Sequence, residues 1–214
     1  MSNKKDYYSK LANTIIKNLS NKGMEGFWAN TKEEALEKAM SFLSYEDKIS
    51  WGDSQTLKEI GFFDAVKSGQ YSYTDVEDLF DEELLEKRDE TYSKIVTSDY
   101  YFLSANAITI NGELVNIDGS GNRLAAMMYG PKHVVVVVGM NKVCSDVESA
   151  YKRIKLIACP QNTIRFNYKT PCSITGKCGD CVGINSICTY TVITRIGRFP
   201  GRIKVILVGE ELGY

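Results

Sequence analysis

The stretch PKHVVVVVG, residues 131–139, is the strongest indication of the fold. Its five consecutive valines, Val134–Val138, are β-branched and leave no polar face, which is typical of a strand that is covered on both sides in a parallel sheet. Residues 4–21, 31–43 and 147–154 repeat apolar side chains at helical spacing. Helices that alternate with short strands predict an α/β fold, with a mostly parallel, Rossmann-like sheet, helices on both faces and an N-terminal helical region.

Several shorter segments have the composition of strands, and they are residues 23–29, 48–51 and 101–104. Residues 107–117 predict a hairpin, and its Asn111-Gly112 pair suits a type I′ turn, which needs a positive φ at both residues. Two further strands, at 188–196 and 202–212, flank a short turn. We expect this late pair to close one edge of the sheet in antiparallel fashion.

Helix starts are predicted where Ser or Thr is followed three residues later by Glu, because the two side chains can cap each other's backbone N–H groups. The pairs are Thr31 with Glu34, Thr56 with Glu59, and Ser145 with Glu148. Residues 75–97 are charged and predict a helix that is capped by Asp75.

The composition is that of an ordinary globular protein. The 214 residues are 43% hydrophobic and 25% charged, which suffices for one domain over residues 1–214. A net charge of −1 gives no argument for a nucleic-acid partner. The longest aliphatic run, Val134–Val138, is too short to span a bilayer, and the N-terminus lacks the apolar segment of a secretory signal. We therefore expect a cytoplasmic protein.

Four of the six cysteines lie in KTPCSITGKCGDCVGINSIC, residues 169–188, with the spacing C-x5-C-x2-C-x6-C. Glycines between them let the backbone wrap around a compact ligand, and four thiolates suit either tetrahedral zinc or a [4Fe–4S] cluster. A reducing compartment disfavours disulfides, so we predict that residues 169–189 form a metal- or cluster-binding loop inserted in the fold. The predicted ligands are Cys172, Cys178, Cys181 and Cys188.

Free thiols, or disulfides formed in air, are the alternative interpretation of this segment. Cys144 and Cys159 stand apart from it, and we expect both to be packing residues.

The loop NIDGSGNR, residues 116–123, has the residue types of a small-anion site. Gly119 and Gly121 free the backbone to approach a ligand, and Arg123 is suited to pair with a carboxylate or phosphate. Leu124 replaces the third glycine of a dinucleotide-binding fingerprint, so a plain Asp-Gly turn remains the alternative.

A second loop lies in WGDSQTLKEIG, residues 51–61, where Ser54, Gln55 and Thr56 stand at the mouth of a helix. These side chains suit an oxyanion, although a well-capped helix explains them equally. The single histidine, His133, is expected to be structural. With one imidazole and no clear carboxylate pair, the sequence predicts no catalytic residue.

Three motifs together resemble the LUD (lactate-utilisation) domain family, over about residues 5–213. They are WGDSQTLKEIGFFDAV, YFLSANAITINGELVNIDGSGNRLAAMMYGPKHVVVVVGMNKV and KTPCSITGKCGDC…SIC. More narrowly, they are similar to its small stand-alone branch with a four-cysteine segment. The resemblance implies an α/β fold of the NagB/RpiA/CoA-transferase-like superfamily, related to ribose-phosphate isomerase and methenyltetrahydrofolate synthetase. It also implies a link to the oxidation of lactate to pyruvate, beside iron–sulfur partner proteins.

In the related enzymes, loops rich in glycine and hydroxyl groups at the C-terminal ends of the strands hold the phosphate or carboxylate of a small ligand. The resemblance therefore implies a site for a small anionic metabolite. Its residues here are Gly52, Ser54, Thr56, Asn106, Asp118, Gly119, Gly121, Asn122 and Arg123. The glutamate nucleophile of CoA-transferases has no match, since Glu113 lies in the predicted hairpin, and we do not expect that activity.

Three functions agree with these features. The favoured hypothesis is a subunit or accessory protein for the oxidation of lactate or a similar hydroxy acid, with a small-anion pocket and a four-cysteine metal or iron–sulfur site. The second is a non-enzymatic scaffold with a structural zinc site, and the third is a small-molecule enzyme that binds a sugar phosphate or nucleotide. The sequence leaves open the substrate, the identity of the metal, and whether the chain forms a homo-oligomer.

Overall fold

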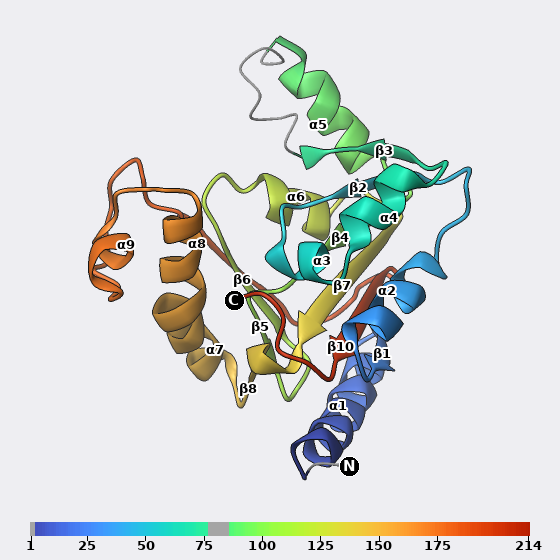
Figure 1. Ribbon diagram of the computed structural model, residues 1–214, viewed down its shortest axis with the longest axis horizontal. Helices are drawn as coiled ribbons and strands as arrows, with labels where there is room; N and C mark the ends of the chain where they lie inside the picture. Colours follow the sequence, from blue (N-terminus) through green and yellow to red (C-terminus); the bar gives the residue numbers. More distant parts are fainter. Residues whose placement is uncertain (1–2, 77–85) are drawn as a thin grey trace.

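The computed structural model describes residues 3–76 and 86–214 (Figure 1). Its main sheet has six strands, all parallel, in the order β1-β10-β7-β4-β2-β3. The strands are β1 (Glu25–Ala29), β2 (Lys48–Trp51), β3 (Ser72–Thr74), β4 (Tyr100–Leu103), β7 (His133–Gly139) and β10 (Ile203–Val208). The valine strand β7 lies inside the sheet, where Val136 is aligned with Val205 of β10 and Leu103 of β4. The predicted α/β fold with a parallel, Rossmann-like sheet is confirmed.

Helices flank this sheet (Figure 1). They are α1 (Asn3–Asn21), α2 (Lys32–Met40), α3 (Gln55–Glu59), α4 (Phe62–Ser68), α5 (Arg88–Val96) and α6 (Asn122–Met128). Helix α1 packs on β1, α2 on β1 and β10, and α6 on β4. No helix within residues 3–76 and 86–214 is both long and apolar enough to cross a membrane.

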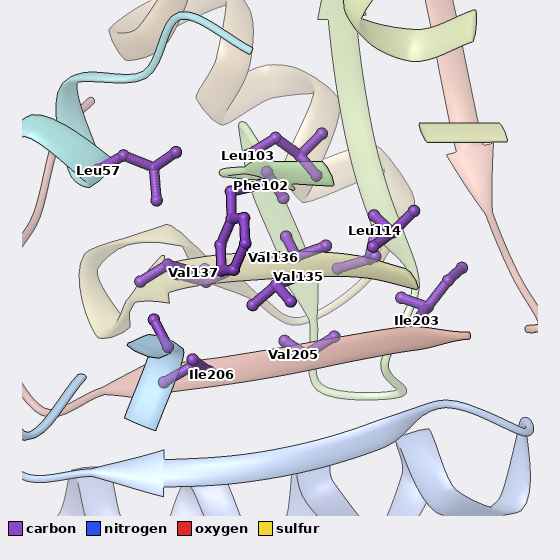
Figure 2. Close-up of a cluster of buried hydrophobic side chains, with 14 of the residues drawn as sticks. Leu57, Phe102, Leu103, Leu114, Val135, Val136, Val137, Ile203, Val205 and Ile206 are labelled. Carbon is purple, nitrogen blue, oxygen red and sulfur yellow. The ribbon is translucent and has the colours of Figure 1, made fainter. Parts of the chain in front are cut away.

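The core is built on the faces of the central strands (Figure 2). All five valines of Val134–Val138 are fully buried. The ring of Phe102 on β4 lies 4.2 Å, between centroids, from that of Phe62 on α4. Burying a Val or Phe side chain contributes about 1.5–3 kcal/mol, so each of these strand residues stabilises the sheet core by an amount that is large beside the net stability of a domain.

A second sheet has four strands in the order β8-β5-β6-β9. They are β5 (Ala107–Thr109), β6 (Leu114–Asp118), β8 (Val143–Cys144) and β9 (Tyr190–Thr194). The predicted hairpin is confirmed, since β5 and β6 pair antiparallel.

The predicted type I′ turn of this hairpin is wrong, because Gly112 has a φ of 84° but Asn111 is not in the positive region. The N–H of Gly112 donates to the carbonyl of Thr109 at 2.8 Å, and the N–H of Thr109 donates to the carbonyl of Glu113 at 2.9 Å. This geometry is a longer hairpin loop in which one left-handed glycine follows an ordinary turn.

The expected antiparallel pairing of the two late strands is also wrong. Strand β9 pairs with β6 in the second sheet, whereas β10 lies between β1 and β7 in the main sheet and runs parallel to both. The reason is the side-chain pattern: the β10 residues Val205–Val208 are fully buried, which suits an interior strand, whereas every residue of β9 is exposed or half-buried.

The helix caps differ in part from the predicted boxes. Thr31 caps α2 by accepting from the N–H of Glu34, as predicted, but the Glu34 carboxylate accepts from the N–H of Asn30 instead of Thr31. Ser54 replaces Thr56 as the cap of α3. This change frees the Thr56 hydroxyl to face the protein interior.

One further helix cap needs correction, and another prediction is tested only in part. The helix α7 (Val147–Arg153) is capped by Asp146, not by Ser145, because its carboxylate accepts from the N–H of Ser149 at 2.7 Å. Asp75 accepts a hydrogen bond from the indole of Trp51 at 3.0 Å. Of the helix predicted over 75–97, α5 covers Arg88–Val96, and residues 77–85 lie outside the described part of the chain.

The helix α7 continues through a π-helical turn, η4 (Ile154–Ala158), into α8 (Cys159–Arg165). The N–H of Cys159 donates to the carbonyl of Ile154, five residues back. Pro160 has no N–H for the regular i→i−4 bond, and a wider turn accommodates it. A short helix, α9 (Pro171–Thr175), follows, and Figure 1 shows this arm on the opposite side of the molecule from α1 and α2.

Candidate functional site

A cavity of about 650 Å³ opens at the C-terminal ends of the main-sheet strands. The segments that follow β2, β4, β7 and β10 all contribute to its wall, through Thr56, Ser104, Lys142 and Tyr214 among others. These segments meet because parallel strands end at the same edge of a sheet, which is where open α/β sheets bind ligands. The rest of the wall comes from Val76 after β3, from the loop after β6 and the start of α6, from α8 and the residues that follow it, and from Ile187 of the cysteine segment.

The structure brings most of the predicted site residues together. Gly52 and Gly121 are the two that do not line this cavity. The seven that do are Ser54, Thr56, Asn106, Asp118, Gly119, Asn122 and Arg123. Their role in binding a ligand stays a prediction.

Gly52 and Gly121 do not line the cavity, but their lack of a side chain allows the neighbouring residues to form its wall. A Cβ atom on Gly52 would lie 2.8 Å from Arg123 Cγ and 2.8 Å from the Tyr101 hydroxyl. Gly121 has a φ of 82°, a conformation that favours glycine. Gly52 therefore lets Arg123 pack closely against β2, and Gly121 allows the turn into α6.

Arg123 is held by internal acceptors. Its Nη1 donates to the carbonyl of Ser104 at 3.2 Å and to the side chain of Asn116 at 3.1 Å. Its Nη2 donates to the side chain of Asn106 at 3.3 Å and to the carbonyl of Ile117 at 2.9 Å. All four terminal N–H groups of the guanidinium thus have protein partners, so Arg123 fixes the geometry of the wall.

Asp118 balances the charge of Arg123. Its Oδ1 accepts from the N–H of Gly121 at 3.0 Å, and its Oδ2 lies 3.3 Å from Arg123 Nε. The second contact is an ion pair that is too poorly aligned to be a hydrogen bond, and Oδ2 has no other partner in the described residues. Both side chains are largely buried, so the pair is little screened by solvent.

Lys142 is the functional candidate that sequence reasoning missed. It ends the 3₁₀ helix η3 (Met140–Lys142), directly after β7, and is only 3% exposed. Its Nζ donates to Thr56 Oγ1 at 2.7 Å and to Ser104 Oγ at 3.0 Å. Within residues 3–76 and 86–214, no carboxylate oxygen lies within 4 Å of this nitrogen.

Burial lowers the pKa of Lys142 to about 7. The positive charge of Arg153 lowers this pKa further, whereas the more distant carboxylate of Glu59 opposes the shift. Near neutral pH the side chain therefore exchanges between an ammonium ion and a neutral amine. A sequence signal did exist, because a lysine directly after a central parallel strand falls at the ligand-binding edge of the sheet.

The remaining charged residues that line the cavity are paired. Arg165 of α8 holds Asp53 in a two-pronged contact, with distances of 3.0 and 2.8 Å from its two terminal nitrogens to the two carboxylate oxygens. Arg123 and Asp118 form the second pair. Among the charged side chains of the described lining residues, Lys142 is thus the one without an opposite charge in contact.

The predicted metal ligands do not converge on one point. Cys172 is buried, and its Sγ lies 3.4 Å from the Thr163 hydroxyl and 3.2 Å from the Thr170 hydroxyl. Cys188 Sγ lies 3.4 Å from Cys159 Sγ. In the described part of the chain, no three Cys, His, Asp or Glu side chains are grouped closely enough to hold a metal ion. Metal binding by the four cysteines stays a prediction.

Cys159 and Cys188 nevertheless connect the cysteine segment to the cavity. The contact between the two thiols lowers the pKa of Cys188 to about 7 and raises the pKa of Cys159. Ile187, the neighbour of Cys188, lines the cavity and packs on Gly119, while α8 carries both Cys159 and the cavity residue Arg165. Movement of the cysteine segment would therefore change the cavity wall.

His133 lies at the start of β7, at the opposite edge of the sheet from the cavity. Its ring is 4.8 Å from that of Tyr100, and burial lowers its pKa. The structural role of His133 stays a prediction.

The model of the LUD domain family matches residues 12–208. A DUF162 family protein from Deinococcus radiodurans has a similar structure, with a TM-score of 0.54 at 9% identity over 94% of this chain and 98% of that chain. No curated protein matches the sequence.

Two other solved structures are similar to parts of the chain. One is eIF2B delta from Chaetomium thermophilum, with a TM-score of 0.35 and 21% identity over 53% of this chain and 48% of that chain. The other is ribose 5-phosphate isomerase A from Neisseria gonorrhoeae, with a TM-score of 0.34 and 18% identity over 60% and 65%. These TM-scores are too low to support an argument about function. The family match, in contrast, spans nearly the whole chain, and the protein therefore belongs to the LUD domain family.

Proposed function

We propose that the protein takes part in lactate utilisation by binding a small carboxylate metabolite, of the 2-hydroxy or 2-oxo acid class, in the cavity at the C-terminal edge of the sheet. Membership of the LUD family supports the metabolic setting. The observation that carries the proposal is the buried Lys142, which lacks a carboxylate partner within the described residues. A buried ammonium ion without a counter-ion is costly, which favours the neutral amine while no carboxylate is bound, and a bound carboxylate would supply the counter-ion for the protonated form.

Amide groups in the cavity wall complement this cation. The Nδ2 groups of Asn106 and Asn122 have no protein acceptor in the described part of the chain, and both residues line the cavity. Amide N–H groups donate readily to a carboxylate or hydroxyl oxygen. The cavity thus combines one cation without an ion-pair partner, two available donors and the hydroxyl of Ser54, which suits a small polar acid.

Calorimetric titration tests this function. Lactate and pyruvate should bind the wild type, and Lys142→Met should weaken binding at least tenfold. Acetate, which lacks the hydroxyl or keto oxygen on C2, tests whether that oxygen contributes to binding. Ribose 5-phosphate tests the alternative of a sugar-phosphate enzyme. The proposal fails if no hydroxy or oxo acid binds, or if Lys142→Met binds them as well as the wild type does.

We also propose that Cys172, Cys178, Cys181 and Cys188 bind a [4Fe–4S] cluster or zinc, which would make the protein an accessory subunit beside iron–sulfur partners or a zinc-stabilised scaffold. The support is the donor set, four thiols in one segment that borders the cavity wall. A cluster would supply electron transfer, whereas four-thiolate zinc is structural. Metal and sulfide analysis of protein purified without oxygen distinguishes the two, and a protein that contains neither metal refutes both.

A further inference from the structure

We infer that Lys142 is a covalent catalyst, which forms an imine through its Nζ with the carbonyl carbon of a small 2-oxo acid. This inference rests on the proposed function, because it needs an oxo acid in the cavity. It goes beyond that function in assigning a chemical step and a nucleophile. A lysine used only to bind an anion would act as a charged donor and would never share a covalent bond with the ligand.

The hydrogen bonds around Lys142 support a neutral amine. The hydroxyl of Thr56 can donate its one hydrogen to the carbonyl of Leu212, at 3.4 Å, and the hydroxyl of Ser104 can donate to the carbonyl of Ala105, at 3.2 Å. Both hydroxyl oxygens then accept from Lys142 Nζ, at 2.7 and 3.0 Å. A neutral amine has two N–H groups and one lone pair, so these two acceptors use both hydrogens and leave the lone pair unengaged.

By the same count, an ammonium ion would have one N–H group without a hydrogen-bond acceptor within the described residues, and its charge would face no carboxylate. The charged groups that act on Lys142 are Arg153 and Arg123, which favour the neutral form, and Glu59, which opposes it. Desolvation and neighbouring cations are the two ways in which proteins activate a lysine as a nucleophile.

The proposed step is balanced without a co-reactant. The lone pair of Lys142 Nζ forms a bond to the carbonyl carbon, and the π electrons of the carbonyl move to its oxygen, which takes up a proton. Nζ loses one hydrogen in this addition and a second when the hydroxyl group leaves as water. The products are one imine and one water molecule, and nothing is oxidised or reduced.

Borohydride trapping tests the inference on the intact protein. Pyruvate is the probe, and reduction of an imine should leave a stable secondary amine on a single peptide that contains Lys142. Lactate, which has no carbonyl group to attack, should give no adduct. The exposed Lys58 of α3 is an internal control that should stay unmodified.

Variants and a binding measurement make the result decisive. Lys142→Arg keeps a cation and should lose the adduct completely, whereas Lys58→Arg should keep it. Pyruvate that binds in calorimetry but gives no adduct at Lys142, or an adduct spread over exposed lysines, overturns the imine and leaves the proposed function standing. Absence of both binding and adduct overturns the two together. Peptide mapping of the wild type decides the question even if a variant fails to fold.

Discussion

The Nζ of Lys142 lies 2.7 Å from the hydroxyl of Thr56, and this contact joins the segment after β7 to the segment after β2. Thr56 Oγ1 also lies 3.4 Å from the carbonyl of Leu212, so the segment after β10 is tied into the same cluster. Three loops from three strands thus meet at one titratable nitrogen. Protonation of Lys142 should therefore change the stability of the C-terminal edge of the main sheet.

The first prediction concerns the pH dependence of folding. The pKa of Lys142 falls from its ordinary 10.5 to about 7 in the folded protein, so the unfolded chain holds a proton there that the folded chain lacks between these pH values. The cost of burying Lys142 is therefore complete below pH 7 and is relieved as the pH rises. Relative to Lys142→Met, the wild type should gain up to about 1.4 kcal/mol of unfolding free energy per pH unit in this window.

Urea denaturation of both proteins between pH 7 and 10 measures this difference, and the variant cancels contributions from other groups. A difference that is flat across the window would mean that Lys142 keeps an ordinary pKa in the folded state.

The second prediction concerns the buried pair of Arg123 and Asp118. Arg123→Met should lower the unfolding free energy by about 3–5 kcal/mol, because it leaves Asp118 charged and buried without its partner. Arg165→Met breaks the more exposed contact with Asp53 and should cost about 1 kcal/mol or less. Urea denaturation at pH 7 compares the two, and equal losses would contradict the structural role assigned to Arg123.

The third prediction concerns Gly52. Gly52→Ala places a methyl group 2.8 Å from both Arg123 Cγ and the Tyr101 hydroxyl, which forces Arg123 to shift. We expect a loss of about 1–3 kcal/mol in stability, as in other overpacked sites, and weaker binding of the acid ligand. Gly183→Ala is the matched control, since a Cβ there meets no atom within 4 Å. The expectation is wrong if thermal unfolding cannot tell the two variants apart.

The fourth prediction concerns the cysteines. Cys178→Ser should abolish bound metal in protein purified without oxygen, while Cys144→Ser should not change it, because Cys144 lies in β8, outside the segment. Cys159→Ser is the informative case, since its thiol touches that of Cys188. If Cys159→Ser binds as much metal as the wild type, the four predicted ligands stand. If Cys159→Ser loses the metal, Cys159 is itself a ligand in place of one of the four. Retention of metal by Cys178→Ser contradicts the predicted set.

The sequence predicted the elements whose pattern depends on local burial. The valine strand, the α/β class and the hairpin β5–β6 follow from runs of apolar residues and from the alternation of helical and strand segments. These patterns do not depend on which element packs against which. The place of β10 did not follow, because strand order depends on which element covers which face, and this is a long-range property. The cap of α3 moved from Thr56 to Ser54 for a similar reason, since a distant lysine engages the Thr56 hydroxyl.

The sequence predicted the loops of the candidate site but not its buried lysine. Seven of the nine predicted residues line the cavity because they follow strand ends that the fold brings to one edge. Lys142 follows such an end too, but a lysine near a turn usually points to solvent, and its burial becomes evident only when Thr56, Ser104 and Arg153 are in place.

The pairing of charges in the cavity has a consequence for how the protein would exchange protons with its surroundings. With Asp53 and Asp118 each matched by an arginine, the net side-chain charge of the described wall depends on the protonation of Lys142. An entering anion stabilises the protonated lysine, and an iminium ion also carries one proton more than a neutral amine. Occupation of the site should therefore draw a fraction of a proton from the solution at neutral pH. The heat of binding would then change with the ionisation enthalpy of the buffer, which makes the buffer a reporter of this one side chain.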